Sequence, residues 1–358
     1  MAGPLVSVVL PVYNAERYLS QTLDSLARQT HDDYELIAID DGSSDKSLAI
    51  LESYRAADDR IRIISRENRG ISRTLNEGIA ASRGELIARM DADDVAYPER
   101  LARQVALMTA RPALALCGTH VDYLISDSRV LRVPASAVTG QEIAIMTIFD
   151  PVFVHPTVMF RAQTIREENG PYSTDYPHCE DFELFRRLAA SREAALITEP
   201  LLAFRINHPS VRTRHAILQN HSHYRVVAEN VQRLGITSAA ILEETTRPGR
   251  DFMPADAEAL AACLHDIDAL APRFAAHAAT FAFAYRRFVS HLFESLLLRH
   301  PTGEITRIFS TPALISQLGR RTRMLAALSR LIPAETAQKI RGTAVAAGQR
   351  LRSRPLPL

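Results

Sequence analysis

The chain has 358 residues, enough for a large hydrophobic core and for more than one structural unit. Hydrophobic residues make up 47% of it and charged residues 23%, a balance that is typical of folded proteins and excludes a disordered chain. The net charge is +1, so the average charge indicates no particular partner, and we expect no nucleic-acid binding. The three cysteines, Cys117, Cys179 and Cys263, are far apart, which favours a reducing compartment and core positions over disulfides or a metal site.

Membrane contact is predicted only for the end of the chain. No stretch approaches the roughly 20 apolar residues of a membrane-spanning helix. The first apolar run, LVSVVLPV, is too short for a secretion signal, so we expect a cytoplasmic protein. From Gly319 onward, nine Lys and Arg residues stand against the single acid Glu335, and they are mixed with apolar residues. This tail either contacts anionic lipid at the inner face of a membrane or forms a solvated helical face.

The first 120 residues alternate between two hydrophobic periods. Apolar runs predict strands, and the stretches between them carry apolar residues three or four apart, which predicts helices. This alternation predicts a mainly parallel sheet that is covered by helices on both faces. The predicted strands are 5–11, 34–39, 61–65, 85–90 and 113–119, and the predicted helices are 14–29, a segment through Leu48 and Tyr54, 71–82 and 98–110.

The later part of the chain changes character twice. Residues 121–214 mix strand and helix signals with a loop rich in Pro, Gly and Tyr. Beyond about residue 215 the strand signals fade, and Leu, Ala, Arg and His recur at helical spacing. We therefore predict a first domain over residues 1–214, in two halves at 5–120 and 121–214, and a helical C-terminal region with a basic amphipathic tail over residues 215–358.

Polar residues follow three of the predicted strands, in the stretches PVYNAE, DDGSSD and DADD. Ligands of open α/β sheets bind at the carboxyl ends of the strands, so these stretches should share one site. Asp91, Asp93 and Asp94 repel one another unless a cation neutralises them. Glycine-rich phosphate loops are missing, which disfavours a dinucleotide enzyme or a P-loop NTPase, so a bound phosphate would need Mg²⁺ or Mn²⁺ as a bridge. The alternative is a solvated turn in which Asp94 caps the next helix.

These stretches resemble family 2 glycosyltransferases of the GT-A fold, in that family's order, over about residues 5–212. The resemblance implies a Rossmann-like α/β sheet whose half at 5–120 binds a nucleotide-diphosphate sugar, by family a UDP-sugar. It implies transfer of the sugar, with inversion, to a saccharide or lipid-linked saccharide on the side of residues 121–214, in cell-surface or extracellular polysaccharide synthesis. The resembling stretches are VSVVLPVYNAERYLSQTLDSLARQT, ELIAIDDGSSDKS, NRGISRTLNEGIAASRGELIARMDADD, PERLARQV, HPTVMFR, EDFELFRRLA and FRINHPSV.

The resemblance also implies roles for particular residues. Asp91 and Asp93 correspond to the metal-binding DxD aspartates, and His208 corresponds either to a histidine near the metal or to a plain loop residue. Glu180 and Asp181 correspond to a catalytic pair in which Asp181 is the better candidate for the base, and the helix N-terminus should keep Asp181 ionised. The expected donor contacts are Pro11, Val12, Tyr13, Asp40, Asp41, Ser72, Arg73, Asn76, Asp91 and Ala92.

Two other functions compete with sugar transfer. A sugar-phosphate nucleotidyltransferase shares the sheet and an acidic metal site, but it would need a glycine-rich, basic loop that PVYNAER does not supply. A degenerate nucleotide-sugar-binding module is disfavoured because the DADD and ED stretches are intact. His155 is interpreted as a packing residue or as part of the acceptor-side wall.

Overall fold

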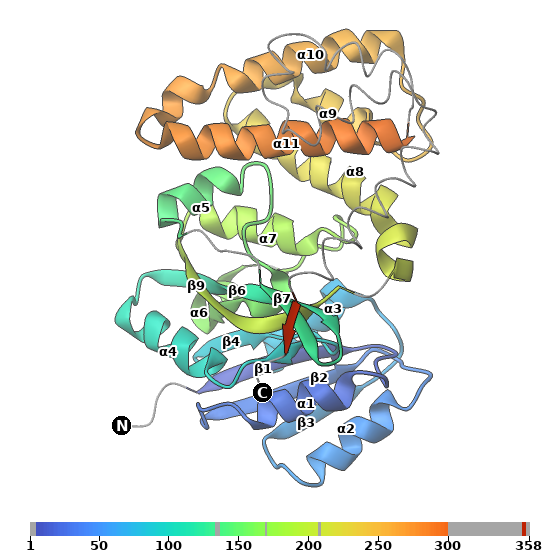
Figure 1. The fold of residues 1–358 in the computed structure, drawn as a ribbon, viewed down its shortest axis with the longest axis vertical. Helices are drawn as coiled ribbons and strands as arrows, with labels where there is room; N and C mark the ends of the chain where they lie inside the picture. Colours follow the sequence, from blue (N-terminus) through green and yellow to red (C-terminus); the bar gives the residue numbers. More distant parts are fainter. Residues whose placement is uncertain (1–4, 133–136, 169, 207–208, 300–352, 356–358) are drawn as a thin grey trace.

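The computed structural model describes residues 5–132, 137–168, 170–206, 209–299 and 353–355, with one mixed, mostly parallel sheet at its centre (Figure 1). The strands are β1 (Val6–Val12), β2 (Tyr34–Asp40), β3 (Ile61–Ser65), β4 (Leu86–Arg89), β5 (Val95–Ala96), β6 (Leu114–Ser126), β7 (Arg129–Arg132), β8 (Met159–Arg161), β9 (Glu193–Arg205) and β10 (Ser353–Pro355). Their order is β10-β7-β6-β8-β4-β1-β2-β3, and β9 pairs with both β6 and β5.

The predicted α/β fold is confirmed by this sheet. Strands β1, β2, β3 and β4 lie in the predicted segments and run parallel to one another, so the carboxyl ends of β1, β2 and β4 meet at one edge. Strand β6 begins in the fifth predicted segment and continues to Ser126, in parallel with β9. The short strand β8 runs antiparallel between β4 and β6 and joins the two parts of the sheet.

Helices cover both faces of the sheet because the side chains of its strands alternate between two cores. On one face, Val8 and Leu10 of β1 pack with α1, α2 and α4, whereas Val9 faces a second core with α3, α6 and α7. The helices of this part are α1 (Leu19–Ala27), α2 (Ser47–Arg55), α3 (Ile71–Ala81), α4 (Arg100–Ala110), α5 (Gly140–Met146), α6 (Ala162–Glu167) and α7 (Glu180–Ala189).

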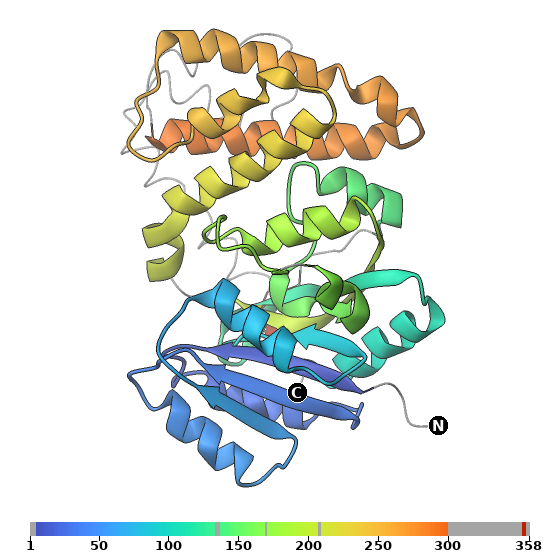
Figure 2. The same ribbon diagram turned by 180° about the vertical axis from the view of Figure 1, so that it is seen from behind.

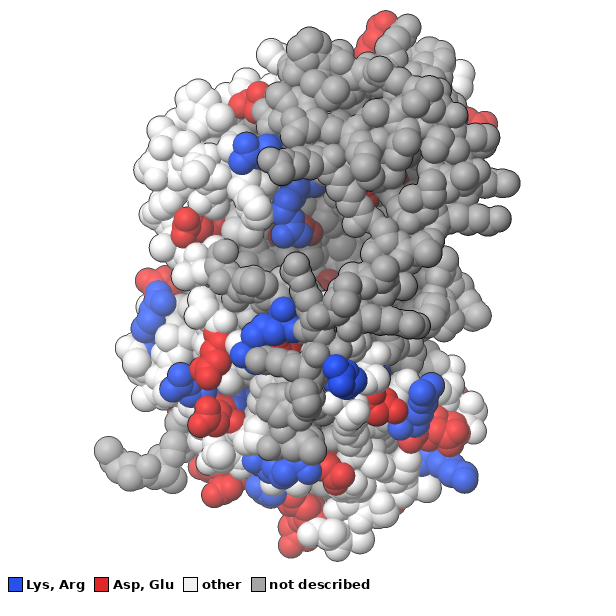
Figure 3. Space-filling view, in the orientation of Figure 1, with Lys and Arg blue, Asp and Glu red and all other residues white. Residues whose placement is uncertain are grey.

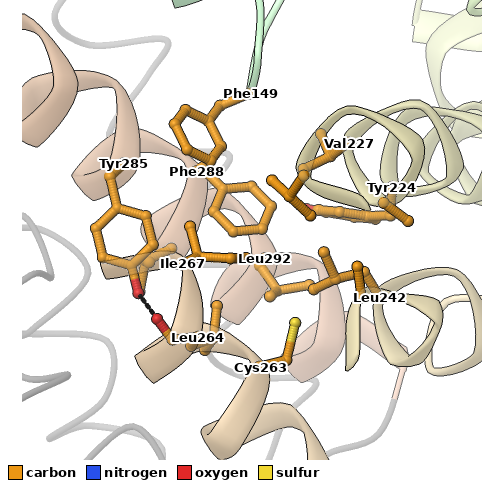
Figure 4. Packing of buried hydrophobic residues seen from close by; sticks show 14 of the residues in the cluster. Phe149, Tyr224, Val227, Leu242, Cys263, Leu264, Ile267, Tyr285, Phe288 and Leu292 are labelled. Atoms are coloured by element: carbon orange, nitrogen blue, oxygen red, sulfur yellow. Dashed lines mark hydrogen bonds between the residues drawn. The ribbon is translucent and has the colours of Figure 1, made fainter. Parts of the chain in front are cut away.

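A third core lies among the C-terminal helices, which stack beyond α5 and α7 (Figures 1 and 2). Phe149, Tyr285 and Phe288 pack against one another in it, and the Tyr285 hydroxyl donates to the Leu264 carbonyl at 2.6 Å (Figure 4). Phe182 of α7 belongs to this core, so α7 is held from both sides. The helices here are α8 (Pro209–Arg233), α9 (Ala240–Glu244), α10 (Pro254–Asp268) and α11 (Ala278–Arg299), and three 3₁₀ turns, η1 (His155–Thr157), η2 (Thr237–Ala239) and η3 (Ala271–His277), complete the fold.

The predicted domain boundary after residue 214 falls inside α8, and the division into units stays a prediction. None of the described helices is both long and apolar enough to span a bilayer. The proposed lipid-binding tail lies outside the described residues apart from β10. On the face in Figure 3, basic and acidic side chains are interspersed over the α/β part, in line with the small net charge. All three cysteines are buried and free, as expected.

Gly78 tests how tightly α3 packs on the sheet. A Cβ atom added there would lie 2.4 Å from Cγ1 of Val9 and 2.9 Å from Cδ1 of Ile39. We expect Gly78→Ala to lower the free energy of unfolding by about 1–3 kcal/mol, although alanine favours helices. Urea unfolding measures this change. Ala80→Gly, on the exposed side of α3, is the control for helix propensity alone, and a stabilised Gly78→Ala protein would contradict the packing.

Candidate functional site

The loops after β1 and β2 are joined by hydrogen bonds. The backbone N–H of Asp41 donates to the Val12 carbonyl at 2.8 Å, and that of Ser44 donates to the Asn14 side chain at 2.8 Å. Asn14 adopts a left-handed φ of 49°, a conformation that Asn tolerates. The predicted donor contacts Pro11 and Val12 are buried in β1, whereas Tyr13 is 56% exposed on the surface of these loops. A flat, solvent-accessible ring is therefore available beside the strand ends.

Asp40 and Asp41 are buried, and both carboxylates have partners inside the chain. Asp40 accepts from the Ser65 hydroxyl at 2.9 Å. Asp41 accepts from the Arg66 guanidinium, from the Arg69 N–H at 2.8 Å and from the Gly70 N–H at 3.1 Å. Asp41 therefore ties the loop that enters α3 to the end of β2. Contact of these two acids with a nucleotide stays a prediction.

The candidates on α3 face the loop that leads into α7. The Asn76 amide donates to the Tyr172 carbonyl at 2.8 Å and accepts from the Tyr172 N–H at 2.9 Å. The Ser72 hydroxyl donates to the Ser173 carbonyl at 3.2 Å, and Arg73 is exposed. Ser72 and Asn76 thus hold the segment before α7 in place, a positioning role that the sequence did not indicate because the partners are about 100 residues away.

The three aspartates after β4 form one cluster. One carboxylate oxygen from each of Asp91, Asp93 and Asp94 lies within 4.8 Å of the others, and Ala92 is buried between them in sequence. Asp94 is buried, accepts from the Arg205 N–H at 2.8 Å, and has no hydrogen-bond partner at Oδ2 among the described residues. Burial, with the charges of Asp93 and Asp91, raises the pKa of Asp94 well above its usual value. Hard oxygen ligands grouped this closely fit Mg²⁺ or Mn²⁺.

The prediction that Asp94 caps the next helix is wrong. Helix α4 begins at Arg100, and Glu99 occupies its N-cap position. Asp94 instead fastens the aspartate loop to the end of β9 through the backbone of Arg205. The Arg205 side chain, 1% exposed, also donates to the Asp93 carbonyl at 2.8 Å. The sequence does not single out Arg205, although this residue lies in the FRINHPSV stretch that resembles the family.

The predicted catalytic pair opens α7 on the other side of the site. Asp181 Oδ1 accepts from the Phe182 N–H at 2.7 Å, and Oδ2 lies 3.9 Å from Nδ1 of His155. Nε2 of His155 is hydrogen-bonded to the Tyr172 hydroxyl at 2.9 Å. Burial and the charge of Arg89 hold the pKa of His155 well below its usual value, so this ring is neutral. His155 therefore forms part of the wall of the site beside Asp181, with its side chain 10% exposed.

The pKa values of both acids in this pair are raised, which is opposite to the effect expected from the helix N-terminus alone. Burial raises the pKa of Asp181, which outweighs the stabilisation that a helix N-terminus gives to a carboxylate. Burial and the neighbouring Asp181 raise the pKa of Glu180 to about 7. The charge of Asp91 contributes to both shifts, so the pair and the aspartate cluster share one electrostatic environment. His208, the third predicted metal ligand, lies outside the described residues.

The mixed, mostly parallel sheet with helices on both faces has the architecture of the GT-A class of fold. The chain belongs to glycosyltransferase family 2: its residues 7–170 match the sequence model described as "Glycosyl transferase family 2". It is 30% identical to the O-antigen biosynthesis glycosyltransferase WbnJ of Escherichia coli over 58% of this chain and 82% of that protein. It is 34% identical to the putative glycosyltransferase EpsE of Bacillus subtilis (strain 168), over 52% of this chain and 67% of that protein.

The same fold is found among solved structures. The chain superimposes on the mannosyltransferase PcManGT from Pyrobaculum calidifontis with a TM-score of 0.52 and 19% identity, over 82% of this chain and 85% of that one. At this identity the likeness supports the fold alone. The predicted family and fold class are confirmed by these comparisons.

Glu180 yields a stability prediction for the protein without ligands. Its folded-state pKa, about 7, lies above the ordinary value of 4.5, so its contribution to stability is present below about pH 4.5 and is lost as the pH rises through about 7. Glu180→Gln removes this loss. From about pH 4.5 to about pH 8, we expect the difference in unfolding free energy to move in favour of the variant by up to about 3 kcal/mol. Urea unfolding at both pH values measures it, and parallel pH dependences would contradict the shifted pKa.

Proposed function

We propose that this family member is an inverting, metal-dependent glycosyltransferase that moves a sugar from a nucleotide-diphosphate sugar to an acceptor hydroxyl. The observation that carries the proposal is that two sets of acidic residues share one electrostatic environment. One set is Asp91 and Asp93 at the strand ends, and the other is Glu180 and Asp181 at the start of α7. The first set can bind a cation that in turn binds the donor diphosphate, and the second set can remove a proton from the acceptor.

Asp181 is the proposed base. It takes the proton of the acceptor hydroxyl as that oxygen attacks the anomeric carbon from the face opposite the diphosphate, so a single displacement inverts the configuration. Burial raises the pKa of Asp181, which makes its ionised form a stronger base than an exposed aspartate. His155, which is hydrogen-bonded to Tyr172, lies beside this carboxylate. A single positioned base at this place is sufficient for direct transfer.

Asp91 and Asp93 are the proposed metal ligands. Their carboxylates and that of Asp94 provide clustered hard oxygen atoms, which suit Mn²⁺ or Mg²⁺. When bound, the cation offsets the charge that develops on the leaving diphosphate. PcManGT, which shares the fold, is described in complex with GDP-Man and Mn²⁺.

The donor and acceptor are proposed from the relatives and the resemblance. We infer a UDP-sugar as donor because the family resemblance favours it. The name of WbnJ refers to O-antigen biosynthesis, which supports a saccharide or lipid-linked saccharide acceptor in the synthesis of a cell-surface or extracellular polysaccharide. Contact of the basic tail with anionic lipid, and a cytoplasmic location, stay predictions of the sequence. A nucleotidyltransferase is disfavoured because the chain belongs to the glycosyltransferase family.

The base assignment is tested by Asp181→Ala. With a panel of UDP-sugars and Mn²⁺, donor turnover should fall by about 10²–10⁴-fold because the acceptor or water keeps its proton, while donor binding remains. Thermal shift with each UDP-sugar measures binding, and release of UDP measures turnover. Asp175→Ala, an exposed acid in the loop before α7, is the matched control and should stay active. Full turnover in Asp181→Ala would refute this base.

The metal assignment is tested by Asp93→Ala without any need for turnover. Wild-type protein that has been treated with a chelator should bind added Mn²⁺, which the loss of the free-ion signal in electron paramagnetic resonance reports. Asp93→Ala should bind it at least about 10-fold more weakly, because one carboxylate ligand is lost. Asp59→Ala removes an exposed acid between α2 and β3 and serves as the control. Equal Mn²⁺ affinity in all three proteins would exclude Asp93 as a ligand.

A further inference from the structure

Arg89 is a buried arginine at the centre of the site. It is the last residue of β4, and its side chain is 6% exposed. Its Nη1 donates to Oδ2 of Asp91, and its backbone N–H donates to the Val158 carbonyl at 2.9 Å. Its Nε is buried and has no hydrogen-bond partner among the described residues. Burying a guanidinium is unfavourable unless opposite charges compensate it. The single hydrogen-bonded carboxylate of Asp91 therefore compensates the buried charge of Arg89 only in part.

The remaining compensation comes from carboxylates on both sides. The charge of Arg89 lowers the pKa values of Asp94, Glu180 and Asp181 against the effect of burial. The contact with Val158 places Arg89 beside the η1 turn, whose His155 faces Asp181. The charged and titratable groups that face the pair at the start of α7 are Arg89, Asp91, His155, Tyr172 and Cys179. Among these groups Arg89 is the cation, because His155 is neutral.

We propose that Arg89 is a positioning residue that serves as the shared counter-charge of the two carboxylate groups, an inference that rests on the proposed function. On one side, it holds Oδ2 of Asp91 and leaves Oδ1 of that carboxylate for a cation. On the other side, its charge opposes the effect of burial on Glu180 and Asp181 and so favours their ionised forms. The same side chain therefore prepares the donor side and the acceptor side of the site.

A second buried arginine provides the matched control. Arg100 is 0% exposed, and its guanidinium donates to the Arg89 carbonyl at 2.6 Å and to the Gln104 side chain at 3.2 Å. These two hydrogen bonds therefore connect the backbone at the end of β4, just before the aspartate loop, with helix α4. Arg100→Gln should reduce stability without moving the pH profile of turnover that is expected to depend on Arg89.

The first measurement is the pH dependence of turnover. In wild type, kcat should rise with pH as the base ionises. Arg89→Gln keeps a donor for Asp91 but removes the charge, so this rise should move to higher pH by about one pH unit. Arg89→Lys keeps the charge, so the rise should stay near its wild-type position even where kcat or Mn²⁺ affinity falls. A purely structural role would lower activity in both variants without moving the profile.

The second measurement does not need activity. The interaction of Arg89 with Glu180 and Asp181 is present only while these groups are ionised, so it weakens as the pH falls. The decrease in melting temperature that Arg89→Gln causes relative to wild type should therefore be larger at about pH 8 than at about pH 5. Arg89→Lys, which keeps the charge, should show no such widening. Because this readout is a difference in thermal stability, it decides the inference even if Arg89→Gln has no measurable turnover.

The outcomes separate this inference from the proposed function. If wild type transfers no sugar or Asp181→Ala stays active, the proposed function fails, whatever the Arg89 variants do. If wild type is active and Asp181→Ala is not, but Arg89→Gln shows the wild-type pH profile and an unchanged melting difference at the two pH values, the role of Arg89 is overturned. A shifted profile together with the widened melting difference supports it.

Discussion

The gathering of buried carboxylates at one edge of the sheet is the constraint on which the site depends. Asp94 and Glu180 are buried, Asp181 is 25% exposed beside them, and neighbouring acids raise the electrostatic cost of ionising each of the three. Such an arrangement is stable only where hydrogen-bond donors and positive charges compensate the carboxylates. Here they are the Arg89 guanidinium, the Arg205 backbone N–H and the first N–H groups of α7. A divalent cation and a donor diphosphate would complete this balance rather than create it.

The rigidity of α7 follows from its position between two cores. Leu184 and Phe185 pack against the sheet side, whereas Phe182 packs with the C-terminal helices. A helix that packs against a core on both sides can hold the acids of its first turn in a fixed position. The C-terminal helical region, for which the sequence offered no role, therefore supports the helix that carries Glu180 and Asp181. Asn76 adds to this by holding the backbone of Tyr172, just before α7.

Local patterns predicted the parts of the fold that depend on local chemistry. Apolar runs identified β1 to β4, and the turn residues after them identified the edge of the sheet where the acids lie. The missed features are contacts across long stretches of sequence, such as Arg205 on Asp93 and Asn76 on Tyr172. The pKa direction of Asp181 was missed for the same reason: the helix start is visible in the sequence, whereas the burial that outweighs it arises from elements far along the chain.

Arg89 shows where a sequence signal was present but incomplete. It stands in the run ELIARM, whose strand is buried along its whole length, and a charged residue in such a strand requires a buried partner of opposite charge. Asp91, two residues later, satisfies that requirement, so the local sequence gives no reason to expect a further partner. Only the tertiary structure brings α7 close enough for the same guanidinium to act on a second group of acids. A buried arginine next to an acidic strand end is therefore a reason to search for carboxylates on a distant element, because one partner rarely compensates a charge that lies so deep.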